Sequence, residues 1–209
     1  MVPATIKNII FDLGGVIINI DYQKTIDAFQ KLSKAGCTIA FNQQSQSELF
    51  DELETGRISN AAFRDKVREH YQVEGSDEAI DAAWNAMLLD IPQERIDLLR
   101  KLRKDHQLFL LSNTNAIHLI AFNKIVEDSF GIPALDELFD KCYYSHLVDD
   151  RKPNPGIFER ILKENGLKKE ETLFIDDSIQ HIHSAEKVGL KTLHLAPPLT
   201  INQVFADAV

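Results

Sequence analysis

The sequence has few cysteines and no long apolar segment. Only two of its 209 residues are cysteines, Cys37 and Cys142, and they lie far apart without the paired spacing of a metal site. We therefore expect no disulfide framework and a reducing compartment. No apolar run reaches the roughly 20 residues that a membrane-spanning helix needs, and the N-terminal MVPATIK lacks the apolar core of a signal peptide. These features predict a cytoplasmic protein.

Positive charge is also scarce. The chain has 23 lysines and arginines against 32 aspartates and glutamates, which gives a formal net charge of −9 at pH 7. Nucleic acids and anionic membranes bind basic surfaces, so this balance argues against both as partners. A pocket that binds an anion must therefore create its positive field locally.

Short apolar, β-branched runs bounded by polar turns predict five strands. They cover residues 6–11, 108–111, 141–144, 172–175 and 191–195. Helical periodicity lies between the later runs, over residues 93–104, 117–126, 157–165 and 179–188. Gly166 and Gly189 are placed to end the last two helices. Alternating strands and helices favour an α/β fold with a Rossmann-like parallel sheet, and the alternative is an antiparallel α+β arrangement.

Residues 21–91 show helical periodicity and no convincing strand. Within this segment, Ser59 follows the break TGRIS and is a plausible N-cap for the next helix. Pro92 marks the return to the sheet-forming part of the chain. We therefore predict two domains, an α/β core of residues 1–20 and 92–209 and a small inserted helical cap of residues 21–91.

Four polar motifs follow predicted strands at the points where these strands end. Asp12 comes after the first strand, the pair Ser112–Asn113 after the second and the pair Asp176–Asp177 after the fourth. Lys152 lies in the run DRKPNP, shortly after the third strand. Ligands of open parallel sheets bind beyond the carboxyl ends of the strands. Each motif alone is typical of an ordinary turn or cap, but the four together indicate a functional site.

The motifs FDLGGV, LLSN, RKPNPGIF and FIDD, in this order, resemble those of the haloacid dehalogenase-like (HAD) hydrolase superfamily. The likeness covers the core, and the helical segment resembles the cap domain of that superfamily. LLSNTN and AWNAMLLDIP make the chain most similar to the subgroup with bacterial α-D-glucose-1-phosphatases and the phosphatase domain of soluble epoxide hydrolases. The resemblance implies the HAD fold and a phosphoric monoester hydrolase that forms an aspartyl-phosphate.

The residue types in these motifs suit that chemistry. A carboxylate can attack phosphorus and form an aspartyl-phosphate, so Asp12 is the predicted nucleophile. A divalent cation is needed to bring two anions together, and Mg²⁺ prefers oxygen ligands. The predicted cofactor is therefore Mg²⁺, bound by Asp12, Asp177, the backbone carbonyl of Gly14 and, directly or through water, Asp176. Lys152 is the second predicted catalytic residue, because it brings a positive charge to the phosphate and to Asp12.

The phosphate group of the substrate has its own predicted contacts. Ser112 would donate its hydroxyl group and Asn113 its amide group, next to the ammonium group of Lys152. Backbone N–H groups at Gly14 and Gly15 would complete the cradle, since glycine lets the chain approach closely. If the sheet is parallel, the Asp12 carboxylate and Lys152 should lie about one hydrogen-bond length apart.

Gly14 departs from the pattern of the superfamily, in which most phosphatases carry an acid two residues after the nucleophile. That acid protonates the leaving oxygen, and such catalysis is typically worth about 10²–10⁴-fold. Glycine also occurs at this position in some bacterial sugar phosphatases of the subgroup, so it does not by itself imply an inactive site. We expect a preference for leaving groups that need little protonation, such as an anomeric oxygen, an acyl group or a nitrophenolate.

Other residues could take over the proton transfer. Asp21, His146 and His181 are candidates, because histidine titrates near neutral pH and Asp21 begins the predicted cap. Each also has a structural interpretation, Asp21 as a helix cap and the histidines as packing residues. In the cap, Arg57 could contact the leaving group, whereas Trp84 fits the buried face of a helix.

Three alternative functions stay open at this point. A haloacid dehalogenase also uses an aspartate nucleophile but needs no metal, so the pair Asp176–Asp177 argues against it. A phosphomutase would keep the acid that is missing at Gly14. A phosphometabolite-binding regulatory protein would keep the ligands but would need no nucleophile. The sequence favours a Mg²⁺-dependent phosphatase of a small phosphorylated metabolite, such as a sugar phosphate, and leaves its natural substrate and oligomeric state open.

Overall fold

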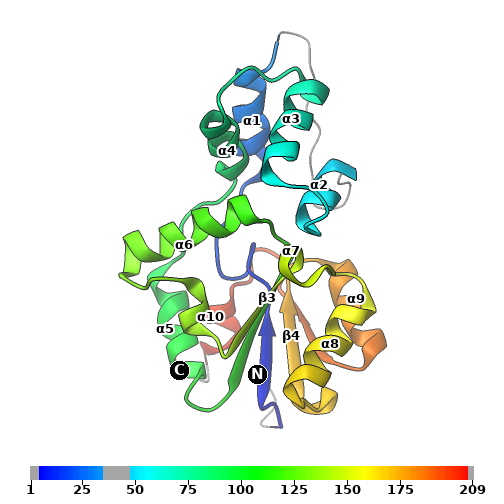
Figure 1. Ribbon diagram of the computed structural model, residues 1–209. Coiled ribbons are helices and arrows are strands. Elements are labelled where there is room, and N and C mark those ends of the chain that lie inside the picture. The colour runs from blue at the N-terminus through cyan, green and yellow to red at the C-terminus, as the bar shows by residue number, and fades with distance from the viewer. Residues whose placement is uncertain (1–4, 35–47, 207–209) are drawn as a thin grey trace.

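The core of the protein is a five-stranded parallel sheet. A computed structural model describes residues 5–34 and 48–206, so Cys37 lies outside the described residues. The strands lie in the order β3-β2-β1-β4-β5 (Figure 1). Their bounds are β1 (Asn8–Phe11), β2 (Gln107–Ser112), β3 (Lys141–Tyr144), β4 (Thr172–Asp176) and β5 (Lys191–His194). The predicted α/β fold is confirmed, and the antiparallel alternative is wrong.

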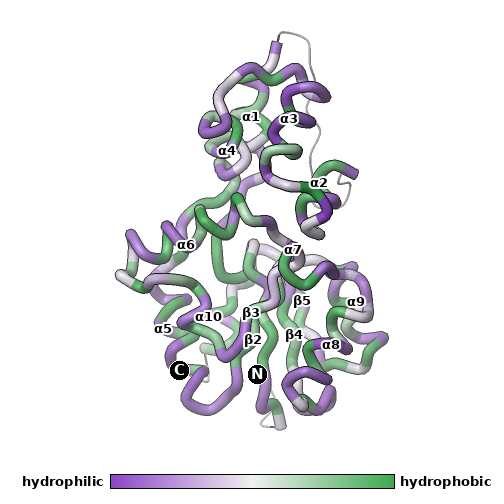
Figure 2. The backbone as a smooth tube through the Cα atoms, in the orientation of Figure 1, coloured by the Kyte–Doolittle hydropathy of each residue, from purple (hydrophilic) through white to green (hydrophobic). Residues whose placement is uncertain are grey.

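Helices cover both faces of this sheet. They are α5 (Gln93–Leu102), α6 (Ala116–Phe130), α7 (Ser145–Val148), α8 (Pro155–Asn165), α9 (Ile179–Val188) and α10 (Ile201–Val204), with short 3₁₀ helices at Leu135–Leu138 and Lys169–Glu171. Side chains alternate along the strands, so Ile9 and Phe11 pack in the cluster with α5, α6 and α10. Ile10 points the other way, into the cluster with α8 and α9. This burial on both faces explains why the strands are continuous apolar runs (Figure 2).

Within the described residues 22–34 and 48–85, four helices form a separate group, which we call the insert helices. They are α1 (Tyr22–Leu32), α2 (Glu48–Glu54), α3 (Asn60–Tyr71) and α4 (Asp77–Asn85). They pack around their own hydrophobic cluster, in which Phe50, Phe63 and Trp84 are almost fully buried. Figure 1 shows this group beyond the carboxyl ends of the strands. None of the described helices of the chain has the length and apolarity to cross a bilayer.

Side-chain caps fix where the insert helices begin. Ser59 accepts a hydrogen bond from the backbone N–H of Ala62, as its predicted N-cap role requires. Asp21 accepts one from the backbone N–H of Gln23 at 3.0 Å, so it is the N-cap of α1. Its structural interpretation is therefore confirmed.

The register of the sheet brings the polar motifs to one edge. Phe11 of β1 lies opposite Leu110 of β2 and opposite Ile175 of β4. The three neighbouring strands therefore end at nearly the same level, and Asp12, Ser112 and Asp176 lie at that edge of the sheet. This placement agrees with the general position of ligand sites in open parallel sheets.

Candidate functional site

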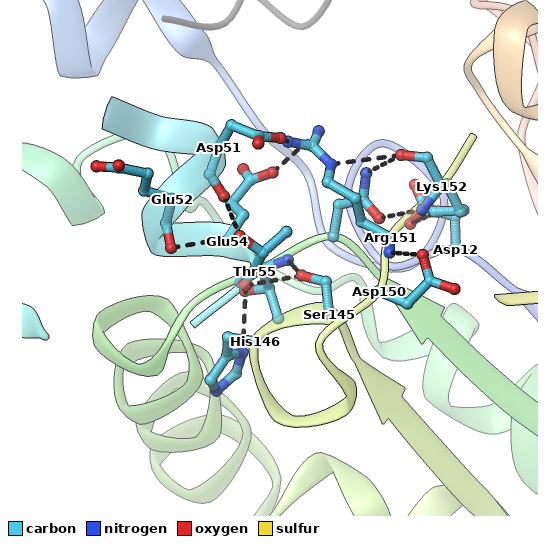
Figure 3. A network of polar contacts seen from close by, with 12 residues as sticks. Asp12, Asp51, Glu52, Glu54, Thr55, Ser145, His146, Asp150, Arg151 and Lys152 are labelled. Atoms are coloured by element: carbon cyan, nitrogen blue, oxygen red, sulfur yellow. Dashed lines mark hydrogen bonds and ion pairs between the residues drawn. The ribbon is translucent and has the colours of Figure 1, made fainter. Parts of the chain in front are cut away.

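A completely buried lysine forms the centre of the site. Lys152 is 0% exposed, and its Nζ lies 2.6 Å from Oδ1 of Asp12 and 2.7 Å from Oδ2 of Asp176. The predicted contact between Asp12 and Lys152 is therefore present (Figure 3). One cation is held between two carboxylates from the ends of adjacent strands, which is an arrangement of strong, charge-assisted hydrogen bonds.

The loop that carries Lys152 is fixed by Asn113. The Nδ2 atom of Asn113 donates to the backbone carbonyl of Lys152 at 2.8 Å, and the backbone N–H of Lys152 donates to Oδ1 of Asn113 at 3.0 Å. In this structure the amide group thus holds the backbone of the lysine. Its predicted contact with a phosphate group stays a prediction, for which the second hydrogen of Nδ2 is available.

Asp176 is held from several sides. Besides Lys152, it accepts hydrogen bonds from the backbone N–H of Ser178 at 2.8 Å and contacts Nδ1 of His181 at 3.0 Å. Burial opposes the ionisation of Asp176, but Lys152 and His181 outweigh it and hold its pKa below the ordinary value. Burial also lowers the pKa of His181. Its side chain therefore orients a carboxylate here, and its role as a proton relay stays a prediction.

Three carboxylates converge at this edge of the sheet. Ligand oxygens of Asp12, Asp176 and Asp177 all lie within 4.8 Å of one another. Burial raises the pKa of Asp12 to about 8, with Asp176 and Asp177 adding to the effect and Lys152 opposing it. Such a cluster of hard oxygen ligands fits a divalent cation, which would favour the ionised forms. The carbonyl of Gly14 as a further ligand stays a prediction.

Gly14 and Gly15 differ in whether their positions could accept a residue with a Cβ atom. Gly15 has a φ of 71°, and a Cβ atom added there would lie 2.4 Å from Oδ2 of Asp177. Both the backbone conformation and the space therefore demand glycine at this position. Gly14 has no positive φ, and an added Cβ would meet only the side chain of Ile20, at 3.2 Å. The backbone thus does not explain the glycine in place of the usual acid.

Replacing Gly15 by alanine is expected to weaken Mg²⁺ binding by about 10–100-fold, because the new methyl group displaces the Asp177 carboxylate. Titration calorimetry with MgCl₂ measures the affinity. Gly14→Ala is the matched control and is expected to bind Mg²⁺ within about threefold of the wild type, since Cδ1 of Ile20 can move aside. Equal affinities of Gly15→Ala and the wild type would contradict the prediction.

A cavity of about 90 Å³ lies beside Asp12, between the sheet edge and the insert helices. From the core, Ser112 lines it, and this residue is almost fully buried. The predicted donation of the Ser112 hydroxyl to a phosphate group stays a prediction. From the insert helices and their flanks, Tyr22, Glu54 and Trp84 line the same cavity. A substrate bound at Asp12 would therefore contact both parts of the chain.

Direct contacts join the insert helices to the site. Arg151, the residue before Lys152, pairs with Oδ1 of Asp51 at 2.6 Å and with Oε2 of Glu54 at 3.1 Å (Figure 3). Both acids belong to α2, so an ion-pair network connects this helix to the loop that carries Lys152. Arg57, the predicted contact for the leaving group, instead pairs with Asp51 at the surface.

A second connection runs through α4. The ring of Trp84 contacts the ring of His118, on α6, edge to face with the centroids 4.7 Å apart. Trp84 is 1% exposed, so its interpretation as a buried residue is confirmed. His146 lies outside this contact, and its Nδ1 lies 3.2 Å from the backbone carbonyl of Thr114. A role of His146 in proton transfer stays a prediction.

Known proteins of one family are similar to this chain. The model of the haloacid dehalogenase-like hydrolase family matches residues 6–189. The chain is 35% identical to D-ribitol-5-phosphate phosphatase from Bacteroides thetaiotaomicron over 187 residues, which cover 90% of each chain. It is 26% identical to the sesquiterpene phosphatase astK from Aspergillus oryzae, over 94% of this chain and 93% of the relative.

A solved structure shows the same arrangement of elements. It is a HAD family enzyme from Bacteroides thetaiotaomicron, an aspartate-to-alanine variant in complex with magnesium and inorganic phosphate. The TM-score is 0.89 and the identity 36%, with 96% of this chain and 98% of the other chain covered. The fold described above is therefore that of a protein crystallised with both a metal ion and a phosphate ion.

Proposed function

Because the chain belongs to the haloacid dehalogenase-like hydrolase family, we propose that it is a Mg²⁺-dependent phosphatase of a small sugar or polyol phosphate. The observation that carries the proposal is the buried Lys152 between Asp12 and Asp176, with Asp177 beside them. The predictions of the family and of an enzyme are confirmed. The narrower likeness to α-D-glucose-1-phosphatases and epoxide hydrolases is not supported by these relatives, which include a D-ribitol-5-phosphate phosphatase instead. The cytoplasmic location stays a prediction.

The proposed reaction has two steps at Asp12. A carboxylate oxygen of Asp12 attacks the phosphorus atom, and the bond from phosphorus to the leaving oxygen breaks, which gives an aspartyl-phosphate and an alkoxide that takes a proton from water to become the alcohol. Water then attacks the same phosphorus atom, releases phosphate and restores the carboxylate. The nucleophile is positioned for both steps by its hydrogen bond to Nζ of Lys152.

The other residues position and neutralise. We propose that Asp12, Asp176 and Asp177 hold Mg²⁺, which supplies positive charge to the phosphate oxygens when bound. Lys152 adds a second positive charge, at a place fixed by Asn113. The insert helices act as a cap that excludes water from the cavity. The magnesium and phosphate in the similar solved structure support this assignment.

The alternatives have less support. A dehalogenase needs no metal, so it leaves the convergence of three carboxylates unexplained. A phosphate-binding regulatory protein could use the same ligands, and turnover distinguishes it from an enzyme. The named phosphatase at 35% identity favours turnover for this chain.

Phosphate release from a panel of esters tests the proposal. The panel contains D-ribitol 5-phosphate, glucose 6-phosphate, glucose 1-phosphate, p-nitrophenyl phosphate and acetyl phosphate, each with Mg²⁺ and with chelator. We expect Mg²⁺-dependent release, lowered at least about 100-fold by the chelator. Faster cleavage of the last three would support the leaving-group preference inferred from Gly14, and equal rates would contradict it. No release from any ester, with phosphate still bound, would establish the regulatory alternative.

A further inference from the structure

Two residues that line the cavity beside Asp12 each have a buried polar atom without a hydrogen-bond partner among the residues that the structure describes. These atoms are Nδ2 of Asn115 and Nδ1 of His118. Both residues line the cavity, and they are only 1% and 5% exposed. Leaving such a group unpaired destabilises the folded state, so native proteins rarely keep one without a reason.

The direction of the Asn115 amide is fixed by the helix that it caps. Its Oδ1 accepts hydrogen bonds from the backbone N–H groups of Ile117 at 3.1 Å and His118 at 3.0 Å. Only the oxygen of an amide can accept these hydrogen bonds, so the remaining terminal atom of the side chain must be Nδ2. Asn115 therefore keeps two N–H donors without a partner among the described residues, in a side chain that lines the cavity, and it cannot rotate without losing the cap of α6.

His118 is held as a neutral ring. Burial lowers the pKa of His118 to about 3, with a smaller contribution from His146. The edge-to-face contact with Trp84 fixes the plane of the ring. A neutral imidazole nitrogen either donates or accepts one hydrogen bond, depending on the tautomer. A hydroxyl group can do both, so it can accept from Asn115 and pair with either form of His118.

The charges around the cavity disfavour a second anionic group on the ligand. Lys152 pairs with two aspartates, and Arg151 pairs with Asp51 and Glu54. Glu54 itself lines the cavity. A carboxylate or a second phosphate group near Asn115 would thus meet cations that are already neutralised. A neutral hydroxyl group would meet donors and acceptors without a charge penalty.

We propose that Asn115 and His118 form a hydroxyl-binding subsite for the leaving group of the substrate. This subsite selects neutral polyol and sugar monophosphates over alkyl phosphates and over phosphates with a second anionic group. The inference rests on the proposed phosphatase function and specifies which part of its substrate is recognised. The subsite orients the leaving group while Asp12 and Lys152 act on the phosphate.

Selectivity between matched esters tests the subsite. The readout is the ratio of kcat/KM for D-ribitol 5-phosphate to that for n-pentyl phosphate, which has the same carbon chain without hydroxyl groups. Asn115→Ser keeps a capping oxygen but loses the amide donor, and His118→Phe keeps the ring against Trp84 but loses Nδ1. Each is expected to lower the ratio about 10–100-fold, the value of one or two lost hydrogen bonds.

The control is His183→Phe, at an exposed position of α9 outside the cavity lining, and we expect the ratio to stay within about twofold. Thermal unfolding verifies that every variant is folded. Ratios for Asn115→Ser and His118→Phe that equal the wild-type ratio would overturn the subsite, even where both activities fall. A loss confined to the hydroxylated ester is a result that a purely structural role of these residues does not produce.

A second pair of esters tests the charge argument. D-Sorbitol 6-phosphate and 6-phosphogluconate differ mainly in a terminal hydroxyl group against a carboxylate. The wild type is expected to prefer the neutral ester by at least about tenfold in kcat/KM. Equal values would overturn this part of the inference while leaving the phosphatase function intact. Absence of phosphate release from every ester would instead overturn the proposed function, and with it the subsite.

Discussion

Asp12→Asn is expected to lower kcat for phosphate release by at least about 10⁴-fold, because an amide cannot form the aspartyl-phosphate. The same change should leave the stability of the metal-free protein equal or higher. Asparagine keeps an oxygen that can accept from Nζ of Lys152, now 2.6 Å from the Asp12 carboxylate. Steady-state kinetics and urea unfolding with chelator measure the two effects.

The expected stability follows from the charges at the site. Burial, with smaller contributions from Asp176 and Asp177, raises the pKa of Asp12 to about 8 against the effect of Lys152. Without Mg²⁺, an ionised Asp12 therefore costs folding free energy, and a neutral amide removes this cost. With Mg²⁺, the wild type gains stability by binding the ion, and the variant gains less because it has lost one ligand. The difference between the two conditions identifies Asp12 as a metal ligand as well as a nucleophile.

Asp105→Asn is the control, since Asp105 is exposed on the surface. It should keep the wild-type kcat and the wild-type response to Mg²⁺. More than about 1% residual activity in Asp12→Asn would contradict the role of Asp12 as nucleophile. Trapping of a stable phosphorylated Asp12 in the wild type, without discharge, would favour the regulatory alternative.

The strands could be predicted from the sequence because each is a continuous apolar run buried on both faces. The predicted bounds differ from the observed ones by at most two residues, as for β1, which begins at Asn8 and not at residue 6. The order of the strands in the sheet did not follow from the runs themselves. The strand order depends on which face of the sheet each connecting helix covers. The apolar periodicity of a helix does not indicate that face.

Helix ends were predicted less well where the signal is polar. The helix predicted over residues 117–126 extends to Phe130, where Gly131 ends it with a φ of 65°. Its last turn contains Glu127, Asp128 and Ser129, which interrupt the apolar period. The four-residue helices α7 and α10 are too short for a periodic signal, although Thr200 and Gln203 form a capping box for α10.

The core half of the site could be predicted, and the half near the insert helices could not. Asp12 directly follows β1 and Asp176 is the last residue of β4, so the parallel sheet alone places them together. Arg151 and Glu54 are 97 positions apart in sequence, and their ion pair depends on how the insert helices fold over the core. The role of Asn115 as a helix cap fully explains this residue in the sequence. Nothing in the sequence therefore indicates that its Nδ2 group lacks a partner among the described residues.

The proposed role of His118 could not be predicted from the sequence either, because a histidine in the first turns of a helix is usually an ordinary helix residue. The usable signal is its distance of three positions from Asn115, which places both side chains at the same end of α6. Since Ser112 and Asn113 end the preceding strand, that end of α6 lies at the site. A search for polar residues in the first turn after each strand motif would have found both.

Lys152→Met is expected to destabilise the metal-free protein by about 3–5 kcal/mol, because it leaves two buried carboxylates without their counter-charge. It should also lower kcat about 10²–10³-fold through the loss of positive charge at the phosphate. Lys152 is 0% exposed, so water cannot take the place of the ammonium group. Urea unfolding with chelator measures the first effect and phosphate release with saturating Mg²⁺ the second.

Two further variants distinguish the effect of burial on stability from the effect of an ion pair as such. Lys141 lies 2.7 Å from Glu164, as close as Lys152 is to Asp176, but its side chain is 46% exposed. Lys141→Met should therefore cost no more than about 1 kcal/mol. In the double variant Lys152→Met with Asp176→Asn, one buried charge fewer should restore part of the stability but not the activity. An equal cost for the two lysines would contradict the account, because the electrostatics of the site would then not depend on its burial.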